Sequence, residues 1–248
     1  MKNSGLTNRI LWGLLLVFLS FLFYLLNYAI FKNAHDIFFY LIDDIAFVFI
    51  QVLLVTVIIE YLLASREKSN LLQKLNMVIG AFFSEVGTDL LKSFTPFDTS
   101  SDMINKHLMI SAEWSPQHFK KAKVLLSKRD SDIDCATGNL EDLQKFLADK
   151  RGFLLRLLEN PNLLEHELFT ELLWAVFHLS EELSHRQDVK ALPDSDYKHL
   201  AVDIKRAYHL LLREWLSYIE HLKNNYPYPF SLALRTNPFD PDTSPQVK

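Results

Sequence analysis

The sequence has little of what builds a disulfide-stabilised or turn-rich protein. Cys135 is the only cysteine among 248 residues, so no internal disulfide can form. Six glycines and nine prolines are present, and the prolines gather toward the C-terminal end. This composition favours helices over a β fold rich in loops. The single cysteine is compatible with a reducing compartment but does not prove one.

The chain also lacks a strong charge imbalance and the motifs of common enzyme chemistry. Its formal net charge of −4 is small and evenly divided, so nothing in it attracts nucleic acid. It has no glycine-rich phosphate loop, no nucleophile elbow and no Cys-x-x-Cys pair. We therefore expect no cofactor and favour a role other than catalysis.

Two long apolar segments stand before residue 65. Residues 10–31 carry no formal charge, and residues 45–64 carry one near their end. Each is at least about 30 Å long as a helix, enough to cross the hydrocarbon core of a bilayer. A cleaved signal peptide would have a shorter apolar core, of about 7 to 15 residues. The sequence predicts a two-helix transmembrane hairpin over residues 1–64.

Basic residues flank the two predicted spans, whereas the loop between the spans offers only Lys32. They are Lys2 and Arg9 before the first span, and Arg66, Lys68 and Lys74 after the second. By the positive-inside rule, both termini face the cytoplasm. The expected location is the plasma (inner) membrane, with the lipid bilayer as a partner.

Two adjacent carboxylates, Asp43 and Asp44, precede the second span. Inside a membrane such a pair marks an ion path or a proton relay, whereas at the outer interface it is simply hydrated. We favour the interface, because residues 45–64 cross the membrane without the pair. Gln51 shares a helix face with Asp44, but Thr56 and Glu60 lie on another face, so no continuous polar stripe forms. An oligomeric ion channel lined by Asp43, Asp44 and Gln51 is therefore the second hypothesis.

From residue 65 onward, the apolar positions recur every three or four residues, which is typical of helices. The second span is expected to continue into the first of these helices. Ser115-Pro116 and Asn139 are typical N-terminal helix signals. Short polar breaks between the segments favour an all-α, antiparallel helical bundle on the cytosolic side over residues 65–239, with a disordered tail over 240–248. The helices are expected near 102–110, 119–128, 140–158, 163–186 and 196–222.

Histidines and carboxylates recur at helical spacing in the last two of these helices. Glu182 and Asp196 each precede a histidine by three residues, a spacing that di-metal helical bundles use for two ligands. The candidate metal ligands are Glu171, His178, Glu182, His185, Asp196 and His199. We favour the alternative, a hydrated surface, because the run 180–182 is polar at adjacent positions. A metal-dependent helical enzyme is the third hypothesis.

The segment after residue 224 is rich in aromatic residues and proline. It is expected to be extended, with one helical turn over 231–235. Burial against the bundle is favoured over docking of a partner, because exposed aromatic residues are costly. The candidate interaction residues are Tyr226, Tyr228, Phe230, Arg235 and Phe239.

The leading hypothesis combines these features. It is an integral membrane protein whose cytosolic helical domain binds or organises a protein partner. Self-association as a homo-oligomer is also expected.

Overall fold

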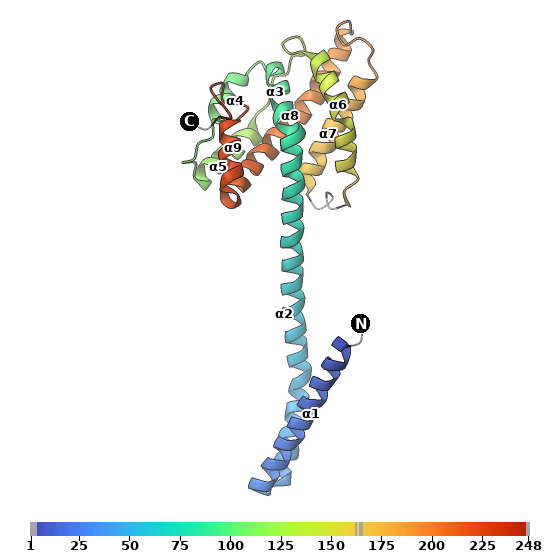
Figure 1. Ribbon diagram of the computed structural model, residues 1–248, viewed down its shortest axis with the longest axis vertical. Coiled ribbons are helices and arrows are strands. Elements are labelled where there is room, and N and C mark those ends of the chain that lie inside the picture. The colour runs from blue at the N-terminus through green and yellow to red at the C-terminus, as the bar shows by residue number, and fades with distance from the viewer. Residues whose placement is uncertain (1–3, 162, 164–165, 247–248) are drawn as a thin grey trace. The chain divides into compact units, whose positions relative to one another are not determined.

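The protein is all-α, as predicted. The computed structural model describes residues 4–161, 163 and 166–246, and within them the extended backbone is limited to an isolated bridge between Asp98 and Ile133. The chain divides into two compact units, Met1–Lys68 and Ser69–Lys248. Figure 1 shows the order of the helices.

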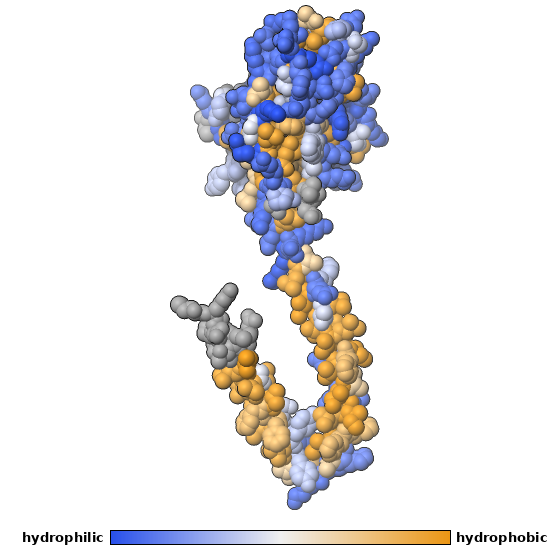
Figure 2. Space-filling view, turned by 90° about the vertical axis from the view of Figure 1, so that its right-hand side faces the viewer, coloured by the Kyte–Doolittle hydropathy of each residue, from blue (hydrophilic) through white to orange (hydrophobic). Residues whose placement is uncertain are grey.

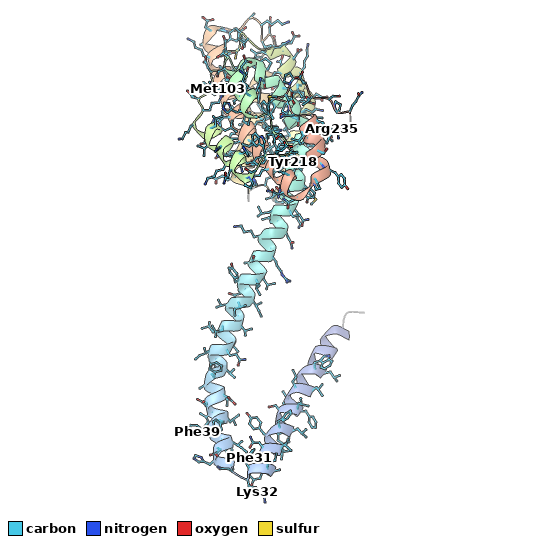
Figure 3. The ribbon with its side chains drawn as sticks, turned by 90° about the vertical axis from the view of Figure 1, so that its left-hand side faces the viewer. Phe31, Lys32, Phe39, Met103, Tyr218 and Arg235 are labelled. Carbon is cyan, nitrogen blue, oxygen red and sulfur yellow. The ribbon has the colours of Figure 1, made fainter. Side chains whose placement is uncertain are left out.

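The first unit contains helix α1 (Ser4–Phe31) and the first part of helix α2 (Ala34–Phe82). Two residues, Lys32 and Asn33, connect the helices (Figure 3). Lys32 has a φ of 50°, which lets the chain reverse. The Asn33 side-chain oxygen then accepts hydrogen bonds from the backbone N–H groups at 35 and 36, which caps α2.

From Ile10 onward, both helices of this unit expose apolar side chains on every face, and Figure 2 shows one side of this apolar surface. Four consecutive residues of α2 illustrate this, since successive side chains point about 100° apart around a helix. Phe47, Val48, Phe49 and Ile50 are 58%, 46%, 74% and 54% exposed. By length and composition, α1 and α2 can each cross a membrane. In water such surfaces would be strongly unfavourable.

The second unit begins with the end of α2 and continues through a π-helical turn η1 (Phe83–Gly87), helix α3 (Thr88–Phe94) and a 3₁₀ turn η2 (Thr95–Phe97). Most of the apolar stripe predicted for this stretch is buried, and Leu75, Phe82 and Leu90 are fully covered, whereas Leu72 is 42% exposed. The π turn departs from the regular helix expected from the periodicity. The hydroxyl of Thr88, the first residue of α3, donates a 2.8 Å hydrogen bond to the Phe83 carbonyl oxygen at the start of this turn.

Six further α-helices lie in the described part of this unit. They are α4 (Ser101–His107), α5 (Pro116–Lys128), α6 (Leu140–Leu158), α7 (Glu167–Ser184), α8 (Asp194–Asn225) and α9 (Pro227–Arg235). Helix α8 is central, because α3, α5, α7 and α9 all pack against it (Figure 1). Residues 162, 164 and 165, before α7, lie outside the described residues, and the helix predicted from residue 163 is described as α7 from Glu167 onward.

Two helices begin at the predicted signals. Ser115 caps α5 with Pro116 at the first helical position, and the His118 side chain accepts a 3.0 Å hydrogen bond from the Ser115 N–H. Asn139 caps α6, and its side-chain oxygen accepts from the N–H groups of residues 141 and 142. These starts follow from local chemistry alone.

The aromatic segment after α8 differs from the expectation. It is helical from Pro227 to Arg235 and not extended. Pro227 and Pro229 lie in the first turn, where backbone N–H groups have no partner within the helix, so the prolines remove no hydrogen bond there. Residues 240–246 form turns and bends, residues 247–248 lie outside the described part, and disorder over 240–248 stays a prediction.

Candidate functional site

Helices α7 and α8 pack against each other in antiparallel fashion and bring together two histidines and two carboxylates. His178 and Glu182 come from α7, one helical turn apart, and His199 and Asp203 come from α8 with the same spacing. Because the helices run in opposite directions, His178 lies opposite Asp203, and Glu182 lies opposite His199. We call these four residues the His–carboxylate cluster.

The polar ends of the cluster alternate between imidazole and carboxylate. The His178 Nε2 atom lies 3.9 Å from Glu182 Oε1 and 3.7 Å from Asp203 Oδ2. The His199 Nε2 atom lies 3.6 Å from Glu182 Oε2 and 3.4 Å from Asp203 Oδ2. Each imidazole therefore faces both carboxylates, and each carboxylate faces both imidazoles.

The cluster is exposed on the imidazole side and covered on the aspartate side. The two histidine side chains are 49% and 51% exposed, whereas Asp203 is 11% exposed. The Asp203 Oδ2 atom is buried and has no hydrogen-bond partner among the described residues. A buried carboxylate oxygen without a partner is unfavourable and is uncommon in folded proteins.

Arg186 borders the cluster and binds two carboxylates. Its Nη1 donates to Glu182 Oε2 at 2.9 Å, while Nε and Nη2 donate to the two oxygens of Asp196 at 2.7 and 2.6 Å. These hydrogen bonds lower the pKa of Glu182 and of Asp196, so both carboxylates are ionised near neutral pH. Asp196, one of the predicted metal ligands, therefore pairs with Arg186 and is not part of the cluster.

Of the six predicted metal ligands, the structure joins His178, Glu182 and His199. Glu171 lies on the exposed face of α7, and His185 ends that helix with its Nδ1 atom 2.8 Å from the Glu181 carbonyl oxygen. Among the described residues, no group of three or more His, Cys, Asp or Glu side chains could hold a metal ion.

Sequence reasoning missed Asp203. The available signal was its spacing of four from His199, which repeats the spacing of Glu182 from His178. Four-residue spacing places two side chains on one helix face, but helix pairing decides which faces meet.

The predicted ion-path residues Asp43, Asp44 and Gln51 are all exposed on α2. Because α2 begins at Ala34, the two aspartates lie about three turns inside the helix and not at its start. Asp44 and Gln51 are two turns apart and share a face.

Of the predicted interaction residues, two aromatic side chains are buried by the chain itself. Phe230 and Phe239 are 8% and 2% exposed. The Phe239 ring packs edge-on against Trp215 with ring centres 4.8 Å apart, and the Lys223 ammonium lies 5.5 Å from the centre of the Phe230 ring.

The other predicted interaction residues lie nearer the surface. Tyr228 is 89% exposed. Tyr226 lies beside His221, with ring centres 5.6 Å apart. The Arg235 guanidinium donates to the Pro245 carbonyl oxygen, and Figure 3 marks its position on α9.

A cavity of about 760 Å³ was not anticipated from the sequence. Its walls come from the loop before α6, the start of α6 and the segment leading into α8, including Cys135, Glu141, Lys190 and Tyr197. The Cys135 thiol donates to the Tyr197 carbonyl oxygen at 3.3 Å, and burial raises its pKa to about 11. The thiol is therefore protonated at neutral pH and is a poor nucleophile.

Comparison with known proteins identifies relatives over nearly the whole chain. Residues 71–235 match the family model described as "Uncharacterized protein MJ1433, C-terminal helical domain", and residues 2–63 match the model of the MJ1433 N-terminal helical domain. The protein described as "Uncharacterized protein MJ1433" from Methanocaldococcus jannaschii is 50% identical over 225 residues, covering 91% of this chain and 90% of that protein. No solved structure matches the chain. The chain therefore belongs to the MJ1433 family and contains both of its helical domains.

Proposed function

We propose that the protein is a two-span protein of the plasma membrane whose cytosolic helical domain binds or organises a protein partner. The observation that carries the membrane location is the exposure of apolar side chains on all faces of α1 and the first part of α2. A helix that is apolar all round must be buried in protein or in lipid, and neither helix is buried within the described chain.

The charge pattern supports an orientation with both termini in the cytoplasm. The loop between the helices carries one basic residue, Lys32, while basic residues flank both spans. One flanking residue, Lys2, lies outside the described residues. In this orientation the second unit is cytosolic, in agreement with a single cysteine that forms no disulfide.

A cavity and an exposed aromatic residue in the second unit support partner binding. This unit provides a cavity of about 760 Å³ and an almost fully exposed Tyr228. Cavities of this volume accommodate a small molecule or a side-chain anchor from another protein.

Self-association is supported by three polar residues on one face of α1. Ser20, Tyr24 and Asn27 share that face and form no side-chain hydrogen bond within the described chain. Inside a bilayer such groups need hydrogen-bond partners, and a second copy of the span supplies them.

Membrane insertion and orientation are tested with cysteine labelling. In a Cys135→Ser background, we expect Asn33→Cys to react with an impermeant maleimide in intact cells. Asp188→Cys, on an exposed loop of the second unit, should react only after permeabilisation. Labelling of position 188 in intact cells, or a chain that stays soluble without detergent, would refute the proposal.

An ion pathway lined by α2 is the second candidate, and one relationship favours it. Asp43 lies about 15 Å along α2 from the two-residue connection between the helices. Leu22 lies at the same distance from this connection along α1, so the two residues are at similar depths. If residues 10–31 fill the hydrocarbon core, the acid pair lies within it, where ionisable groups mark ion paths. Flux into liposomes that Asp44→Asn reduces would support this candidate, and absence of flux from the unmodified protein would remove it.

A further inference from the structure

We propose that a basic cavity formed by α5, the start of α7 and α8 binds a phosphate monoester group. The cavity has a volume of about 310 Å³ and shares no lining residue with the 760 Å³ cavity at the start of α6. Its walls carry three cationic side chains, Lys120, Lys123 and Arg213, and two serine hydroxyls, Ser127 and Ser217. We call it the α5–α8 cavity. The inference goes beyond the membrane anchoring and partner binding proposed above and does not depend on either.

Helical spacing gathers these polar groups around one cavity. On α5, Lys120, Lys123 and Ser127 are three and four residues apart, and on α8, Arg213 and Ser217 are four residues apart. Such spacing places side chains on one face of a helix. Because α5 packs against α8, the two polar rows line the same space. The Ser127 hydroxyl donates within its own helix, whereas the Ser217 hydroxyl forms no hydrogen bond within the described chain and is available to a ligand.

The charge of the lining favours an anion. Among the described residues, the cavity wall contains no carboxylate. Lys123 is paired with Glu220 on α8. Lys120 and Arg213 form no ion pair or hydrogen bond within the part of the chain that the structure describes. Two positive charges are therefore uncompensated, which matches the charge of about −1.5 to −2 on a phosphate monoester at pH 7.

The buried groups next to the cavity do not cancel this charge. Glu214 follows Arg213 in the chain and is only 1% exposed. Burial raises the pKa of Glu214 to about 7, although Lys123 and Arg213 oppose the shift, so its carboxyl is only partly ionised at neutral pH. Burial lowers the pKa of His209, and the positive charges of Arg213 and Lys205 lower it further. The surroundings of Arg213 are thus already positive before a ligand binds.

The side chains of the wall also define the chemical class of the ligand. A guanidinium donates two parallel hydrogen bonds to phosphate oxygens, and lysine ammonium groups add point charges. A carboxylate, with a single negative charge, would leave one of the two unpaired cations uncompensated. The rest of the wall includes the apolar side chains of Val124, Leu126 and Leu168, which suit the carbon body of an ester. A soluble phosphate ester and a lipid headgroup share this chemistry.

The test uses the full chain in a neutral maltoside detergent and two probes with the same phosphate group. Glycerol phosphate is the soluble probe, and lysophosphatidic acid added to the micelles is the lipid probe, with zwitterionic lysophosphatidylcholine as its reference. Binding is followed by calorimetry and by the melting temperature. A response to glycerol phosphate would assign the cavity to a soluble ester, whereas a response to lysophosphatidic acid alone would assign it to a lipid headgroup.

The Lys120→Gln/Arg213→Gln double variant removes both unpaired cations. Its affinity for the responding probe should fall more than about 10-fold, because charge-assisted hydrogen bonds to phosphate are strong. The Lys121→Gln/Lys128→Gln variant is the matched control, since it removes the same charge from exposed positions of α5 that do not line the cavity. It should bind like the unmodified chain.

Circular dichroism and the melting temperature without ligand show whether the double variant folds. Lys120→Glu provides a second test, because this side chain is exposed and without a partner in the described chain, so its replacement should reduce binding and leave the fold intact. Failure of the unmodified chain to respond to either probe would overturn the site. Equal binding by the folded double variant and by the control variant would also overturn it.

Discussion

The carboxylate of Glu214 lies 3.8 Å from the imidazole of His166, and the glutamate is buried while the histidine is partly exposed. Glu214 is 1% exposed, and its Oε2 atom has no hydrogen-bond partner among the described residues. Burial raises the pKa of Glu214 to about 7, although Lys123 and Arg213 oppose the shift. Burial also lowers the pKa of His166. Each group is thus pushed toward its uncharged form.

The first prediction concerns the pH dependence of stability. Because the folded pKa of Glu214 exceeds its ordinary value of 4.5, this group favours folding most below pH 4.5 and loses that advantage as the pH rises to about 7. The loss amounts to about 3 kcal/mol. Glu214→Gln should therefore be more stable than the unmodified chain at pH 8, with a flatter profile between pH 5 and 8.

Thermal melting of the full chain across this pH range measures the difference. Glu220→Gln is the control, since Glu220 lies on the same helix but is more exposed and pairs with Lys123. The lowered pKa of His166 acts in the opposite direction, with stability lost as the pH falls below about 6.5. Equal pH slopes for Glu214→Gln and the unmodified chain would contradict the prediction.

A second prediction concerns the π turn at the end of α2. A Cβ atom at Gly87 would lie 2.6 Å from the Phe83 ring and 2.8 Å from the Phe82 ring. Both rings are buried, so Gly87→Ala should lower the free energy of unfolding by about 1 to 3 kcal/mol. Gly152→Ala, in α6, meets only the tip of Arg156 at 3.8 Å and should leave stability unchanged or raise it by up to about 1 kcal/mol. Equal effects in chemical unfolding would argue against the close approach.

A third prediction concerns a buried ion pair that ties α5 to the loop after η2. The Asp98 side chain is fully buried and binds the Arg129 guanidinium, which also donates to Ser131 Oγ at 3.1 Å. Arg129→Ala leaves the carboxylate without its cation and should cost about 3 to 5 kcal/mol.

Lys92→Ala is the control for this ion pair. It breaks an exposed pair with Asp89 and should cost less than about 1 kcal/mol. The free energies of unfolding of both variants, measured with urea, decide between these values. A small effect at Arg129 would show that Asp98 finds another partner.

A fourth prediction concerns self-association through α1. Ser20→Ala combined with Asn27→Leu removes two polar groups from one face of the helix and should reduce the oligomer observed by light scattering in detergent. Trp12→Leu, which leaves that polar face intact, should not change the mass. A monomeric unmodified chain would refute self-association in detergent.

Features that depend on neighbouring residues were predictable from the sequence. Ser115 and Asn139 cap helices because their side chains reach N–H groups within three residues. The aromatic segment after α8 is helical, although its prolines favour an extended strap when the sequence is considered alone. They are tolerated only because they occupy the first turn of α9.

The sequence alone determined that the chain is helical and that its first two helices are apolar on all faces, because periodicity and local composition specify both. Only the tertiary structure decided that Asp203 lies beside His178, Glu182 and His199. It also decided that Asp196 pairs with Arg186 and lies outside this cluster. The physical reason is that four-residue spacing defines a helix face, whereas the register of α7 against α8 depends on core packing along both helices.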